Sequence, residues 1–179
     1  MAISVDAQIL IWGIKRQATP DRQHMIDRAA RFFRQCQREH QRIFLPAQSL
    51  AEFLVGYDAE QRRLSLARLS RGFLVAPFDA KAAVIAADLQ TDWNKLKAIG
   101  DEFGLTKQQI KADINVLASA LAVNASCLYS EDKQMKSFAQ GRIIIRPLPT
   151  HLPPEDEAYG GSVQQSLLDD DSADGDPPT

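Results

Sequence analysis

The side chains best suited to chemistry in this sequence are four acids that stand far apart. They are Asp6, Glu52, Asp113 and Asp132. Two unit charges at about 4 Å repel by about 4 kcal/mol at an effective dielectric of about 20, so acids brought together need protons or cations. Carboxylate oxygens without nearby His or Cys favour Mg²⁺ or Mn²⁺. Such ions bind phosphate oxygens and activate water, and hydrolysis of phosphodiester bonds is the reaction that best suits this set.

Short apolar segments predict the β-strands that would position these acids, at residues 2–6, 42–46, 72–77, 125–130 and 142–145. Segments with helical spacing lie between them. Helices are expected at about residues 9–12, 20–38, 59–69, 79–97, 106–123 and 131–138, with one opening at Ser49 and a break at 100–104. Ser49 with Glu52, and Thr106 with Gln109, form capping-box patterns. The alternation predicts an α/β fold class, a parallel sheet with helices on both faces.

The predicted elements bring the four acids to one edge of the sheet. Ligands of open parallel sheets sit beyond the carboxyl ends of the strands, and Asp6 ends the first strand. The helix from Asp113 descends about 15 Å to residue 123. The next strand then rises about 16 Å, back to the level of Asp113 near Asp132. Glu52 follows the second strand and opens its helix at the same edge.

Each acid also has a structural interpretation. Asp6 could cap the next helix, and Glu52 could complete the capping box with Ser49. Asp132 could be an acid in the first turn of a helix, where the helix dipole stabilises a negative charge. Asp113 borders an apolar helix face, where an unsatisfied acid is costly, and this favours a site. Ser130 could orient a carboxylate or cap a helix, and the two roles are compatible.

The charge of the chain is divided between a basic body and an acidic end. Residues 150–179 hold eight acids and no Lys or Arg, which leaves 21 bases against 15 acids, a formal +6, in residues 1–149. We expect residues 1–149 to form one domain and residues 150–179 to form an acidic, disordered tail. No membrane helix and no secretory signal is expected, and two apolar-flanked cysteines favour a reducing, cytoplasmic location.

Several cations could contact a polyanion such as RNA. Lys107 and Lys111 lie near the expected cleft by helical position, and arginines recur along the helix 20–38, among them Arg31, Arg34 and Arg38. A solvated helix face is the alternative interpretation of the arginines. Trp12 and Trp93 could stack on bases, although packing is the simpler role.

Four sequence blocks, in order, resemble the PIN domain, in particular its small VapC-type toxin branch. They are residues 3–11 (ISVDAQILI), 45–53 (LPAQSLAEF), 111–120 (KADINVLASA) and 128–138 (LYSEDKQMKSF), and Pro77-Phe78-Asp79 with its alanine-rich helix is also similar. No single block is specific, but the ordered set covers residues 2–147. Ser130 stands where the family usually has Thr, Asn115 where it more often has a small or apolar residue, and the acidic tail is not part of the usual toxin.

The resemblance implies a PIN-like three-layer fold of about five parallel strands in the order 3-2-1-4-5. It implies Mg²⁺- or Mn²⁺-dependent cleavage of RNA by Asp6, Glu52, Asp113 and Asp132 with Ser130, often a homodimer, and in the toxin branch an antitoxin that covers the site. The alternative is a stand-alone PIN-like module in RNA processing or binding, with weak or no catalysis. An aspartate-based phosphotransfer domain is disfavoured, because Ala7 and Gln8 follow Asp6 where a second acid would be needed.

Overall fold

The computed structural model describes residues 1–151, and the predicted acidic tail therefore falls almost wholly outside the described residues. Within them, five strands form one parallel sheet in the order β3-β2-β1-β4-β5. The strands are β1 (Ala2–Val5), β2 (Arg42–Pro46), β3 (Leu74–Ala76), β4 (Cys127–Tyr129) and β5 (Ile144–Arg146). Both the α/β class and the strand order implied by the PIN resemblance are confirmed.

Helices separate the strands. They are α1 (Ala7–Leu10), a π-helical turn (Ile11–Lys15), a 3₁₀ turn (Pro20–Arg22), α2 (His24–Arg38), α3 (Ala47–Phe53), α4 (Ala59–Leu69), α5 (Ala80–Leu89), α6 (Trp93–Glu102), α7 (Lys107–Ala122) and α8 (Lys133–Phe138). None of the helices in residues 1–151 is long and apolar enough to cross a membrane.

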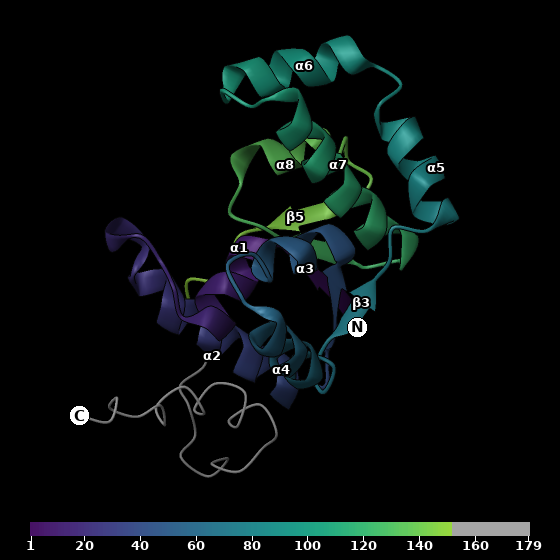
Figure 1. The fold of residues 1–179 in the computed structure, drawn as a ribbon. Coiled ribbons are helices and arrows are strands. Elements are labelled where there is room, and N and C mark those ends of the chain that lie inside the picture. The colour runs from purple at the N-terminus through teal and green to yellow at the C-terminus, as the bar shows by residue number, and fades with distance from the viewer. Residues whose placement is uncertain (152–179) are drawn as a thin grey trace, which may run out of the picture.

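The sheet separates two apolar clusters, which makes the architecture three-layered (Figure 1). Side chains of successive strand residues point to opposite faces. Accordingly, Cys127 and Tyr129 pack in the cluster beneath α2, whereas Leu128 packs in the cluster beneath α5, α6, α7 and α8. The two cysteines are buried and free, as the sequence predicted.

Two helix boundaries differ from those predicted. The expected helix 79–97 is two helices, because α5 ends at Leu89 and Asp92 caps α6 by accepting a hydrogen bond from the Lys95 N–H at 3.0 Å. The expected break at residues 100–104 lies partly inside α6, where Gly100 is buried. A Cβ at Gly100 would stand 2.4 Å from Cδ1 of Ile110, so this glycine allows close helix packing rather than a turn.

The Thr106–Gln109 capping box is confirmed, but the Ser49–Glu52 capping box is wrong. Helix α3 already begins at Ala47, directly after Pro46, and no side chain caps it. Ser49 therefore lies inside the helix, fully buried.

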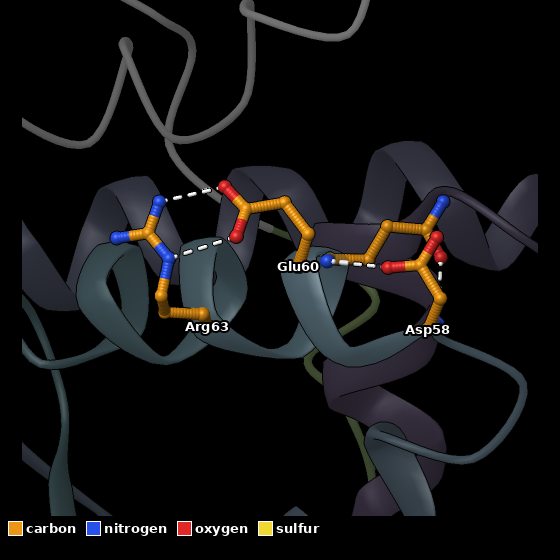
Figure 2. Close-up of polar contacts among 4 residues, drawn as sticks. Asp58, Glu60 and Arg63 are labelled. Carbon is orange, nitrogen blue, oxygen red and sulfur yellow. Dashed lines mark hydrogen bonds and ion pairs between the residues drawn. The ribbon is translucent and has the colours of Figure 1, made fainter.

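A capping box that we did not predict begins α4 (Figure 2). The Asp58 carboxylate accepts from the Gln61 N–H at 2.8 Å, and the Gln61 side chain accepts from the Asp58 N–H at 3.0 Å. Beside it, Arg63 donates two hydrogen bonds to Glu60, at 2.9 and 2.6 Å. Every acid at this helix start thus has a partner.

Candidate metal and catalytic site

Asp6 stands at the carboxyl end of β1 and is the most buried of the four acids, with 8% of its surface exposed. Its backbone N–H donates to the carbonyl of Tyr129 at 3.0 Å, which joins the ends of β1 and β4. Its carboxylate accepts from the Ala7 N–H at 2.7 Å and so also caps α1. The structural and the chemical interpretation of Asp6 are therefore compatible.

Two buried serines hydrogen-bond to the Asp6 carboxylate. Ser130, at the end of β4, donates to Oδ2 of Asp6 at 2.8 Å, and Ser49 of α3 approaches Oδ1 at 3.4 Å. Burial raises the pKa of Asp6 and the charge of Glu52 raises it further, whereas the hydrogen bonds lower it. Ser49 was missed as a site residue because its local sequence pattern indicated a helix cap.

Ser130 links Asp6 to Asp132. Its Oγ donates to Asp6 and accepts from the Asp132 N–H at 3.2 Å, so one hydroxyl fixes both neighbours. Burial raises the pKa of Asp132, and the charges of Asp6 and Glu131 add to this, while Arg22 opposes it. Asp132 immediately precedes α8, but its side chain makes no capping hydrogen bond there. The carboxylate of Asp132 is therefore not used to cap the helix.

Asp113, which is half-buried, comes from the second turn of α7 and is the third acid with a raised pKa. Its pKa rises from 3.8 to about 7, mainly through burial, with further increases from Asp6, Asp132 and Glu52. Gln134 of α8 opposes the shift by donating to Oδ2 of Asp113 at 3.2 Å. Gln134 follows Asp132 by two residues and is a site neighbour that carried no signal in the sequence.

Glu52 lies one residue before the end of α3 rather than in its first turn, and its side chain is exposed. Gln48, one turn earlier, donates to Glu52 Oε1 at 3.4 Å. The charge of Glu52 nevertheless acts on both Asp6 and Asp113, which places it at the same edge. The structure thus brings Asp6, Asp113 and Asp132 within electrostatic reach of one another, and Glu52 within reach of Asp6 and Asp113.

These acids are oxygen donors of the kind that Mg²⁺ and Mn²⁺ prefer. As the side chains stand, no three His, Cys, Asp or Glu residues among positions 1–151 form a group that could hold a metal ion. Like charges push the carboxylates apart, and a cation would remove that repulsion. The donor chemistry therefore fits a hard divalent cation, although the carboxylates do not form a closed ligand shell.

The predicted polyanion-binding cations do not all lie at this edge. Lys107 begins α7 with its Nζ 5.6 Å from the centre of the Trp93 ring, and Lys111 follows one turn later. Arg22, just before α2, is the basic residue whose charge acts on Asp132. Arg31, Arg34 and Arg38 lie further along α2, which runs about 21 Å from His24 to Arg38, away from the carboxyl ends.

Comparisons with known proteins support the fold and go no further. No family model and no curated protein matches the chain. A solved structure that is similar is described as the crystal structure of VapBC2 from Rickettsia felis bound to a DNA fragment from their promoter. The match has 18% sequence identity and a TM-score of 0.58, and it covers 83% of this chain and 100% of that chain. At this identity the likeness shows the fold alone, which is PIN-like.

Proposed function

We propose that this chain is a metal-dependent endoribonuclease that hydrolyses RNA phosphodiester bonds. One observation carries the proposal: three acids with raised pKa values lie at the carboxyl edge of a PIN-like sheet, where the Ser130 hydroxyl donates to Asp6 and accepts from the Asp132 N–H. Buried carboxylates without a compensating cation destabilise a fold, and perturbed acids of this kind cluster at functional sites. The PIN-like fold of the similar structure agrees with this assignment.

Asp6, Asp113, Asp132 and Glu52 are the residues that would hold one or two Mg²⁺ or Mn²⁺ ions. When bound, such an ion activates water and stabilises charge on the phosphate under attack. Ser130 holds the Asp6 carboxylate in one orientation, and Gln134 does the same for Asp113. Near neutral pH the Asp113 carboxyl retains its proton for part of the time, so cation binding would release that proton.

We also propose that the chain is the toxin of a type II toxin–antitoxin pair. The VapC-type resemblance and the likeness to a VapBC2 chain favour this over a stand-alone RNA-processing enzyme. A short neighbouring gene for a small DNA-binding protein, and co-purification of its product with this chain, would support the pair.

The second candidate is a PIN-like RNA-binding module with weak or no catalysis. It is favoured by the lack of a ready three-residue metal-binding group among the described residues. The two candidates differ in whether RNA is cut when Mg²⁺ or Mn²⁺ is added.

The test is cleavage of a panel of single-stranded and structured RNAs with Mg²⁺, Mn²⁺ or EDTA. We expect Asp6→Asn and Asp113→Asn to lower the cleavage rate by more than about 100-fold. Ser130→Ala should lower it by about 10- to 100-fold, and Ser130→Thr should restore it, because the hydroxyl is what the site uses. Asp101→Asn is the matched control, since Asp101 is an exposed acid near the end of α6.

Cleavage that persists in EDTA, or that both aspartate variants retain, would refute the assigned site. RNA binding without cleavage under any metal condition would favour the binding module. Circular dichroism on each variant separates loss of activity from loss of fold.

A further inference from the structure

The chain leaves its folded body at a fixed point beside α2. Leu148 is buried in the apolar cluster under α2, and its N–H donates to Oε1 of Glu131 at 2.8 Å. Arg28 of α2 donates to the carbonyl oxygens of Leu148 and Pro149, the latter at 2.8 Å. These contacts, here called the C-terminal latch, hold Leu148 and Pro149 beside Arg28 of α2.

The surface next to the latch is basic. Helix α2 carries four arginines against one aspartate, and the arginines recur at intervals of three or four residues on one side. Beyond Arg28, which the latch uses, the stripe continues through Arg31, Arg34 and Arg38. Arg31 is exposed, and Asp27, the one acid of α2, faces Arg16 at 3.6 Å.

The sequence that follows the latch has the opposite charge. Beyond Thr150 come eight acids without a compensating base, beginning with Glu155, Asp156 and Glu157. The five residue-to-residue steps from Thr150 to Glu155 can span at most about 18 Å. The stripe from Arg28 to Arg38 is about 15 Å long, so the first acids can reach any of its arginines.

We propose that the acidic segment 155–176 docks on the arginine stripe of α2 in the same molecule. The latch delivers the segment to one end of the stripe, and tethering gives it an effective concentration in the millimolar range. The stripe runs away from the acid cluster at the sheet edge. A docked tail would compete with any polyanion for the basic body. The proposal concerns binding and not cleavage, so it holds or fails independently of the nuclease assignment.

The first experiment measures polyanion binding by the full-length chain. In one variant all eight tail acids become Asn or Gln, which leaves the body unchanged. Binding of a labelled oligodeoxythymidine of about 20 nucleotides is followed by fluorescence anisotropy in EDTA. We expect the neutralised tail to tighten binding about tenfold at low salt, and the difference to vanish near 0.5 M NaCl. Equal affinities of the two proteins at low salt would overturn the proposal.

The second experiment locates the tail directly. A nitroxide is attached at Ser162→Cys, and the native cysteines do not interfere because both are buried. We expect NMR signals of the Arg31–Arg38 amides to broaden, and the broadening to disappear with Arg31→Gln combined with Arg38→Gln. The matched control is Lys95→Gln with Lys97→Gln, which removes two exposed cations from α6 on the other side of the sheet (Figure 1).

Three outcomes would overturn the proposal in this second experiment. One is broadening centred on Lys107 and Lys111 instead of α2. Another is broadening that grows with protein concentration, which would assign the contact to a second copy. The third is broadening that survives loss of the stripe arginines.

Discussion

Two groups of acids in this molecule have opposite surroundings. At the carboxyl edge of the sheet, burial and neighbouring negative charges raise the pKa values of Asp6, Asp113 and Asp132. At the start of α4, Asp58 and Glu60 lie at the surface with their partners in place (Figure 2). There the Arg63 side chain lowers the pKa of Glu60. Both groups include an acid directly before a helix, Asp132 before α8 and Asp58 before α4, so position alone does not distinguish them.

The difference lies in what satisfies the charge. Neighbours within five residues along the chain satisfy the acids of α4, and folding leaves them accessible to water. The edge acids come from β1, α7 and the end of β4, and the tertiary fold forces them together with serine and glutamine as their main partners. A local charge cluster supports a helix, whereas the edge cluster is unfavourable to the fold until a proton or a cation joins it.

The largest expected effect that tests this contrast is a change in the free energy of unfolding with pH, measured in EDTA. Below about pH 4 both the folded and unfolded chains hold the Asp113 proton. Between about pH 4 and 7 only the folded chain keeps it, so stability falls as pH rises through this window, by at most about 4 kcal/mol. Asp113→Asn removes this loss and should gain stability relative to the native protein as pH rises.

Urea unfolding at about pH 4, 5.5 and 7.5 measures the effect for both proteins. Asp58→Asn is the control, because it removes an exposed acid that is not part of the edge cluster. Parallel profiles for the native protein and Asp113→Asn would show that Asp113 is not held in its protonated form by the fold.

The next effect is stabilisation by a divalent cation near pH 7.5. Binding to the folded state alone adds about 2.7 kcal/mol when the cation is at 100 times its dissociation constant, which raises Tm by about 5–10 °C in a domain of this size. We expect this shift with Mn²⁺ in the native protein and in Asp58→Asn, and its loss in Asp6→Asn. A shift that Asp6→Asn retains would place the cation elsewhere.

The sequence was most informative where a local pattern and the fold agree. The strand pattern was sufficient to place Asp6 at a sheet edge, and the length of the helix and strand after Asp113 was sufficient to bring Asp132 to its level. The two edge strands were the exceptions, because Leu74 and Val75 of β3 stay exposed at 47% and 51%, and Ile144 of β5 at 56%, where buried strands were expected. An edge strand has a neighbour on only one side, which its own composition does not reveal.

Sequence reasoning failed where a contact across the fold replaced a local one. Ser49 and Glu52 match a capping box, but Pro46 ends the strand and lets α3 begin earlier, and Ser49 then faces Asp6, 43 residues away. The contact between Gln134 and Asp113 also crosses between two helices and leaves no pattern. By contrast, Asp58 and Gln61 are a capping-box pair that the sequence already contained.

A smaller effect on stability is expected from the acids at the start of α4. Asp58→Ala removes the hydrogen bond to the Gln61 N–H at the start of α4 and should destabilise the protein by about 1 kcal/mol. Asp58→Ser keeps an acceptor at the cap and should recover most of that loss. Urea unfolding at pH 7 compares the three proteins, and a neutral Asp58→Ala would mean that this helix start does not contribute to global stability.

The smallest effect should come from Glu60, although its contacts to Arg63 are among the shortest ion-pair distances in the described residues. Both side chains are more than 60% exposed, so water solvates either charge when its partner is removed. Glu60→Gln should therefore leave the urea midpoint unchanged within error at about 0.15 M salt, and addition of salt should not separate the two proteins further. A clear loss of stability would show that an exposed, partnered acid can matter as much to this fold as the acids at the sheet edge, and the contrast between the two groups would not hold.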